Sequence, residues 1–164
     1  INFFRNPVDR AYSAYNHSSK FGWEHSSFEA AIESEIERIN LMNDKPELKI
    51  NNIDPVNFLQ FSYLRHGHYA SNLENWFKYF KKNQFMHFST EDLDQNYDEI
   101  MNSLFVFFNL SEIKLKKEDR KNIGIGKGKY PSMNEKTRDF LIDYYKPHNE
   151  KLYNLIGKKF DWDK

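Results

Sequence analysis

The first nineteen residues predict a strand, a sharp turn and a helix, which limits the chain to folds that alternate strands with helices. Residues 1–5 form an apolar run that ends in an arginine, a pattern typical of a buried strand. Asn6 can cap a helix with its side-chain oxygen, and Pro7 suits the first helical position because no N–H is needed there. We therefore expect a helix over residues 7–19, with Asp9 returning a hydrogen bond to the cap.

This turn is also suited to binding an anion. The first N–H groups of a helix lack intrahelical partners and carry the positive end of the helix dipole. Arg5 stands at the carboxyl end of the strand, where ligands bind in open α/β sheets. Arg10, Ser13 and His17 follow at spacings of three and four and so share one helix face. The alternative is an ordinary capped helix with a surface arginine and a buried serine.

The rest of the chain reads as further helices around one more strand. The expected elements are a helix starting at Ser26 or Ser27, a polar loop over 43–55, a short helix over 56–65, an amphipathic helix from Tyr69 to Lys82, a buried strand over 84–88, a helix over 97–108, a loop over 109–131, and a last helix over 133–155. Glycines 22 and 157 are expected to end the first and last helices, and Pro147 to kink or split the last one. Two strands alternating with helices favour an α/β layer fold with a parallel sheet. Because two strands are too few to form a stable sheet on their own, further strands are expected before Ile1.

Composition excludes several classes of function. Lys plus Arg and Asp plus Glu number 24 each, so the net charge is zero and broad nucleic-acid binding is not expected. The absence of cysteine excludes disulfides and thiol chemistry. The sequence has no long apolar run and no signal peptide, so we expect no membrane span and a cytoplasmic location. A length of 164 residues fits one domain, residues 1–164.

A second segment with phosphate-binding chemistry lies near the end of the long loop, at residues 126–131. Its glycines allow the backbone to approach a phosphate closely, and its lysines supply positive charge. The alternative is a flexible, solvated loop. His66 and His68 mimic a metal pair, but their spacing is not that of helical zinc ligands and no third ligand is evident, so no metal is expected.

The first of these segments resembles a known family. The residues Arg5-Asn6-Pro7-x-Asp9-Arg10-Ala11-x-Ser13-x-Tyr15 are similar to the 3′-phosphate-binding segment of sulfotransferases that use 3′-phosphoadenosine 5′-phosphosulfate (PAPS). The similarity is closest to the glycan branch, the heparan sulfate N- and O-sulfotransferases, and to bacterial relatives. The resemblance implies that Arg5 and Ser13 hold the 3′-phosphate, and that His17 is a catalytic candidate near the transferring group. An arginine fork and a hydroxyl are chemically suited to phosphate oxygens.

Four more stretches resemble the family in the same order along the chain, and the weakest region of the resemblance is 21–54. Three of them cover residues 67–76, 89–93 and 145–153. The fourth contains Lys127, Gly128, Lys129 and Tyr130, where the family closes a loop over the donor nucleotide. Lys129 replaces the family's arginine, which keeps the charge and loses the bidentate fork. Tyr130 is expected to contact the adenine or to line the nucleotide pocket. The alternative is a tyrosine packed in the core.

The resemblance implies a P-loop-NTPase-like three-layer sandwich with a parallel sheet. This chain would be the C-terminal part of that domain, with the N-terminal strands, the 5′-phosphosulfate loop and the catalytic base before Ile1. The implied reaction transfers a sulfuryl group from PAPS to a hydroxyl or amine of a glycan or another acceptor, releases adenosine 3′,5′-bisphosphate and requires no metal. The alternatives are a non-catalytic nucleotide- or anion-binding module and a helical interaction domain.

Overall fold

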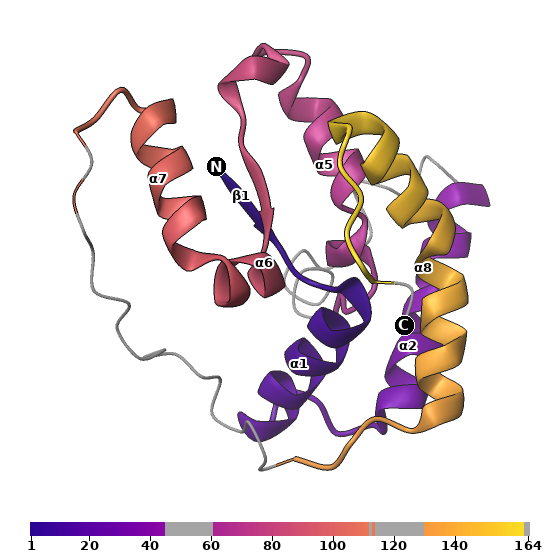
Figure 1. The fold of residues 1–164 in the computed structure, drawn as a ribbon. Helices are drawn as coiled ribbons and strands as arrows, with labels where there is room; N and C mark the ends of the chain where they lie inside the picture. The colour runs from indigo at the N-terminus through magenta and orange to yellow at the C-terminus, as the bar shows by residue number, and fades with distance from the viewer. Residues whose placement is uncertain (45–60, 112, 114–129, 163–164) are drawn as a thin grey trace. The chain divides into compact units, whose positions relative to one another are not determined.

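The computed structural model describes residues 1–44, 61–111, 113 and 130–162 (Figure 1). The chain divides into two compact units. The first contains Ile1–Arg5 and Lys81–Ser132, and the second contains Asn6–Phe80 and Met133–Lys164. The following paragraphs describe each unit by itself.

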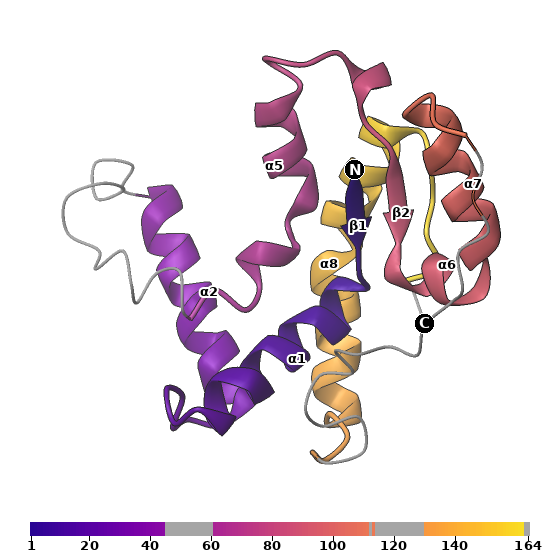
Figure 2. The ribbon, with the colours of Figure 1, turned by 90° about the vertical axis from the view of Figure 1, so that its left-hand side faces the viewer.

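The first unit is built on a parallel pair of strands, which confirms the expected strand direction. Strand β1 (Asn2–Phe4) pairs with β2 (His87–Ser89), with Asn2 opposite His87 (Figure 2). The rings of Phe3 and Phe88 stack across the pair, with centroids 5.5 Å apart. Such cross-strand aromatic contacts stabilise the pairing of short strands.

Strand β2 is shorter than the predicted strand over 84–88. The residues before it, Lys82–Gln84, form a 3₁₀ turn (η2), and the N–H of Phe85 bonds to the carbonyl of Lys82. The side chain of Gln84 also accepts the N–H of Lys81 at 2.9 Å. These local bonds use backbone groups that a longer strand would need for its ladder.

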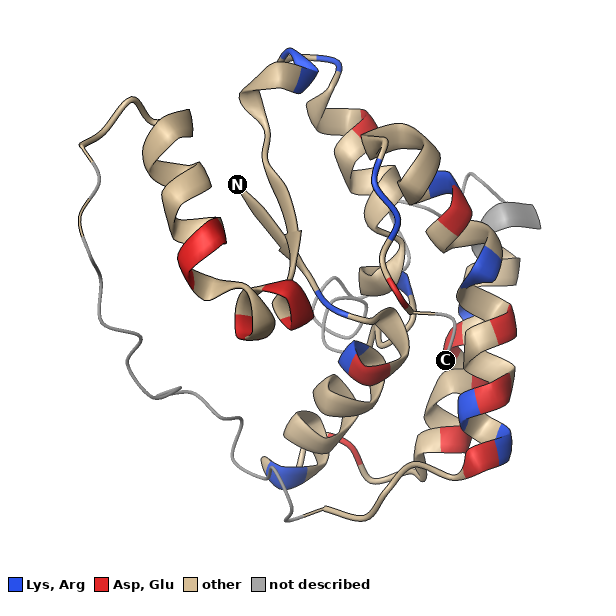
Figure 3. Ribbon diagram, in the orientation of Figure 1, with Lys and Arg blue, Asp and Glu red and all other residues tan. Residues whose placement is uncertain are grey.

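Two helices follow β2 in the first unit. Helix α6 (Thr90–Gln95) is capped by Ser89, whose hydroxyl accepts the N–H of Asp92 at 2.8 Å. Helix α7 (Tyr97–Phe107) agrees with the predicted helix to within one residue. Figure 3 shows acidic residues in α6 and in the first turn of α7, where negative charge is favoured by the helix dipole.

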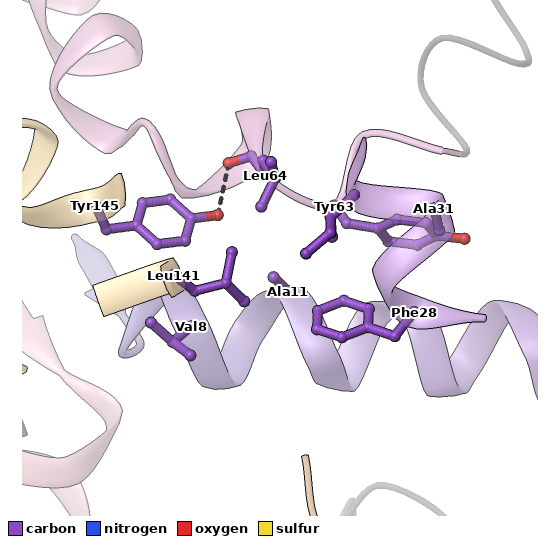
Figure 4. Close-up of a cluster of buried hydrophobic side chains, with 9 residues drawn as sticks. Val8, Ala11, Phe28, Ala31, Tyr63, Leu64, Leu141 and Tyr145 are labelled. Carbon is purple, nitrogen blue, oxygen red and sulfur yellow. Dashed lines mark hydrogen bonds between the residues drawn. The ribbon is translucent and has the colours of Figure 1, made fainter. Parts of the chain in front are cut away.

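The second unit is a helical cluster. It contains α1 (Pro7–Lys20), α2 (Phe28–Asp44), the 3₁₀ turn η1 (Arg65–Gly67), α5 (Tyr69–Trp76) and α8 (Glu135–Ile156). Helix α8 contacts both α1 and α5. The buried core is drawn in Figure 4 and consists of Val8, Ala11, Phe28, Ala31, Ile32, Tyr63, Leu64, Leu141 and Tyr145. Among the described residues, none of the helices has the length and apolar character needed to cross a membrane.

Two predicted helix boundaries in this unit were wrong. The described part of the predicted helix over 56–65 is a turn that leads into η1. Helix α5 ends at Trp76 rather than Lys82, because Tyr79 N–H bonds to Trp76 O and tightens the chain into a turn. Pro147 was expected to kink or split the last helix, and α8 runs through this residue without a break. Tyr145 and Asn149 on either side of that proline are buried, and their packing outweighs one lost backbone bond.

The start of α2 and the ends of α1 and α8 were predicted to within one residue. Ser27 caps α2 by accepting the N–H of Ala30 at 3.2 Å. Gly157 adopts φ 69 directly after α8, and Gly22 adopts φ 70 after α1. Both values lie in the left-handed region that glycine enters without a steric cost.

Candidate functional site

The start of α1 is built as the sequence predicts, except for one side chain. The side-chain oxygen of Asn6 accepts the N–H of Val8 at 3.0 Å, and its amide donates to the carbonyl of Trp162 at 3.4 Å. Asp9 was predicted to bond back to the cap. Its carboxylate instead forms an ion pair with Arg138 of α8 at 2.5 Å. This long-range partner replaces the local one and ties the first turn of α1 to α8.

The predicted donor-binding residues lie on either side of this turn. Arg5 is partly buried in the first unit, and Ser13 is partly buried on α1 in the second. Their joint grip on one phosphate therefore stays a prediction. His17 lies one helical turn after Ser13 and is exposed, and its ring contacts those of Phe21 and Trp23 at centroid distances of 4.8 and 5.9 Å. Its catalytic role also stays a prediction.

The second predicted element is described only at its end. Lys127, Gly128 and Lys129 lie outside the described residues. Tyr130 is described and is partly buried. Its predicted contact with the adenine stays a prediction.

A polar network that sequence reasoning missed surrounds residues 61–65. Side chains from three helices bond to the backbone of this segment. Arg10 of α1 donates to the carbonyl of Tyr63, and Arg38 of α2 donates to that of Phe61 at 2.9 Å. The hydroxyl of Tyr145 on α8 donates to the carbonyl of Leu64 at 2.9 Å (Figure 4). The guanidinium of Arg10, predicted to share a face with Ser13, is thus engaged with the backbone of this segment.

Glu35 is the buried centre of this network. Its side chain is 2% exposed, and its two carboxylate oxygens accept the N–H groups of Leu64 at 2.7 Å and Arg65 at 2.9 Å. Burial raises the pKa of Glu35, while these two N–H groups and the charge of Arg38 act to lower it. The sequence signal was present, because position 35 falls on the apolar face that includes Phe28 and Ile32.

The network continues into a pair of stacked histidines. The rings of His68 and His148 lie face to face, with centroids 3.8 Å apart and planes 8° apart. Nε2 of His68 is 3.0 Å from the hydroxyl of Tyr144. Burial lowers the pKa of His68 to about 4, helped by His148 and by the charge of Arg65. Within the described residues, no group of three or more metal-ligating side chains is gathered here or elsewhere.

Acidification is expected to destabilise the second unit. The folded-state pKa of His68 is about 4, below the ordinary value of 6.5, so the unfolded chain takes up its proton first. Stability present above pH 6.5 is therefore lost as the pH falls toward 4. The pKa of His148 is lowered too, whereas that of Glu35 is raised and opposes the loss. Because the site is partly solvated, we expect a loss of about 1–2 kcal/mol between pH 7 and pH 4.5.

Urea unfolding at several pH values measures this effect. A His68→Gln variant is the control, since it removes the titrating ring and is expected to show a smaller pH dependence over the same range. An equal pH dependence in both proteins would contradict the assignment to His68.

The comparisons with known proteins agree on one family. The profile of the sulfotransferase domain matches residues 1–124. Human bifunctional heparan sulfate N-deacetylase/N-sulfotransferase 3 is 30% identical over 177 aligned residues, which cover 96% of this chain and 19% of that protein. The membrane-associated sulfotransferase kil1 of Dictyostelium discoideum is 28% identical over 102 residues, covering 62% of this chain and 21% of that protein. The chain thus spans about a fifth of the length of these relatives.

A solved structure shows the same fold. The crystal structure of a sulfotransferase from Alicyclobacillus acidocaldarius matches 99% of this chain and 56% of its own, with a TM-score of 0.73 and 23% identity. At this identity, the match bears on the fold alone.

Proposed function

The chain belongs to the sulfotransferase domain family, and from that premise we propose that it transfers a sulfuryl group from PAPS to a hydroxyl or amine of a glycan. The proposal rests on a family match whose first residues form the expected local structure. The family match covers the first 124 residues, and those residues begin with the strand and the Asn6-capped helix that the donor-binding segment requires. We also propose that the parallel pair of strands belongs to a P-loop-like three-layer sandwich, as the fold match supports.

The proposed donor site is the passage from β1 into α1. Arg5 ends the strand segment, and α1 begins two residues later with the positive end of the dipole of a 14-residue helix. We propose that the Arg5 guanidinium forms two parallel bonds to the 3′-phosphate and that Ser13 adds a neutral donor. Lys127, Gly128, Lys129 and Tyr130 are proposed to cover the nucleotide.

Sulfuryl transfer requires that the donor and the acceptor be positioned and that developing charge be stabilised, and it needs no covalent intermediate. The sulfur–oxygen bond to the donor phosphate breaks as a bond from sulfur to the acceptor oxygen or nitrogen forms. The acceptor loses a proton to a base, and adenosine 3′,5′-bisphosphate leaves with the electron pair. Cationic groups at the donor site stabilise the charge that develops on the leaving nucleotide. His17 is proposed to stand near the transferring group, where an imidazole can move a proton.

A glycan acceptor is supported by the relatives. Several relatives are named as heparan sulfate N-sulfotransferases, and they align over almost the whole chain. The second candidate function is a module that binds the nucleotide without catalysis. A purely helical interaction domain is the third, and it predicts no affinity for adenosine 3′,5′-bisphosphate.

Replacing Arg5 with alanine is expected to weaken the binding of adenosine 3′,5′-bisphosphate by about 1–3 kcal/mol, the cost of losing a charge-assisted pair. Isothermal titration calorimetry measures the dissociation constant directly. Lys146→Ala is the matched control, because Lys146 is an exposed cation on α8, far along the chain from the donor segment. An unchanged dissociation constant for the Arg5 variant would count against the donor site, and no binding by the parent chain would favour the interaction-domain alternative.

A further inference from the structure

Two large aromatic side chains stand half-exposed directly after α1, and we propose that they form a stacking surface for a sugar ring of the acceptor. Phe21 is 51% exposed and Trp23 is 49% exposed. The inference rests on the proposed function, because it names the part of the acceptor that this chain would hold. Single exposed apolar residues are ordinary on protein surfaces, but an ordered pair of large rings marks a candidate binding surface.

The rings of Phe21 and Trp23 are stacked on each other. Their centroids lie 5.2 Å apart and their planes differ by 24°, so each ring covers part of the other, and the sugar is proposed to stack on the face of Trp23 that Phe21 does not cover. A pyranose ring has a flat face of C–H groups, while its hydroxyls point outward around the rim. Stacking that face on Trp23 removes apolar surface from water on both sides and leaves the hydroxyls solvated.

The turn that carries the rings is fixed by its backbone. The N–H of Trp23 bonds to the carbonyl of Ser18 at 3.0 Å, and the N–H of Gly22 bonds to that of Ser19 at 3.0 Å. With Gly22 at φ 70, these two bonds form the Schellman motif that ends many helices. The motif by itself explains the contact between Trp23 and His17. The Schellman motif does not explain why the side chains of Phe21 and Trp23 both stay about half exposed.

The aromatic pair continues the proposed site along one side of α1. Ser13, His17 and Phe21 follow at intervals of four residues, so they form one stripe about 12 Å long at 1.5 Å per residue. A glycan with one ring stacked on Trp23 can extend along this stripe and bring a neighbouring ring to His17.

Charge at this end of α1 favours an acidic glycan. The ammonium group of Lys20 lies 5.9 Å from the centre of the Phe21 ring. Figure 3 shows this basic last turn of α1. A cation beside a stacking surface suits the carboxylates or sulfates of an acidic polysaccharide.

The test compares saccharide and nucleotide binding in the same proteins. The probes are a heparan-type hexasaccharide, neutral cellohexaose and adenosine 3′,5′-bisphosphate, each titrated into the full chain by calorimetry. We expect Trp23→Ala to weaken hexasaccharide binding at least tenfold and Trp23→Phe to retain most of it, because a flat ring remains. Trp76→Ala is the matched control, since Trp76 is 55% exposed on α5 and is expected to leave saccharide binding unchanged.

The outcomes separate this inference from the proposed function. Equal hexasaccharide affinity in the parent and in Trp23→Ala would overturn the stacking surface, as would no binding of either saccharide by the parent. Nucleotide binding is expected to be the same in all variants. A third outcome is that the parent binds the hexasaccharide but no nucleotide, and that Trp23→Ala loses the hexasaccharide binding. This result would support the stacking surface and contradict PAPS as the donor.

Discussion

Replacing Gly67 with alanine is expected to destabilise the second unit by about 2–4 kcal/mol. A methyl group at this position would lie 2.7 Å from Cε1 and 2.8 Å from the hydroxyl of Tyr145, and 3.0 Å from Cβ of Pro7. Moving Tyr145 aside would cost free energy, because its side chain is completely buried and its hydroxyl donates to the carbonyl of Leu64. The overlap must therefore separate η1 from α8 or break this buried hydrogen bond.

The urea midpoint of unfolding, followed by circular dichroism, measures the loss. Gly22→Ala is the matched control, because Gly22 has a positive φ but nothing within 4 Å of the added carbon. That variant is expected to lose only about 1–2 kcal/mol from backbone strain. A Gly67→Ala protein that unfolds at the same urea concentration as the parent would show that the close packing of Tyr145 on this glycine does not exist in solution.

Local signals allowed the helix ends and the strand direction to be predicted from sequence. Asn6, Ser27 and Gly157 act on backbone groups within three or four residues of themselves, so their effect can be read from the sequence without the fold. The parallel pairing of β1 and β2 followed from the alternation of strands and helices. Boundaries were less accurate where turns such as η2 compete with a strand for the same backbone groups.

Long-range partners could not be predicted in the same way. Asp9 has two possible partners, a nearby cap and a distant arginine, and the packing of α1 on α8 brings it to Arg138. The apolar pattern of α2 places Glu35 on the buried face, but nothing in the pattern names Leu64 and Arg65 as its partners. The positions of Arg5 and Ser13 indicated an anion site from the sequence alone, but their assignment to the 3′-phosphate of a nucleotide came only from the resemblance to a family.

Removing the carboxylate of Glu35 is expected to have the largest effect of any single change, a loss of about 3–5 kcal/mol for Glu35→Ala. The substitution leaves the N–H groups of Leu64 and Arg65 without their acceptor, and Leu64 is fully buried. It also removes the negative charge that faces Arg38. Glu33→Ala on the exposed face of α2 is the control and is expected to change stability by less than about 0.5 kcal/mol.

A Glu35→Gln variant separates the role of the charge from that of the hydrogen bonds. The raised pKa of Glu35 means that burial favours the protonated acid more than the bonds and Arg38 favour the carboxylate. A neutral amide avoids that burial cost and keeps one oxygen acceptor, but its NH₂ group faces a backbone N–H. We therefore expect Gln to lose about 1–3 kcal/mol, between the parent and alanine, in urea unfolding at pH 7. Alanine and the parent unfolding within about 1 kcal/mol of each other would mean that residues 61–65 are held without Glu35.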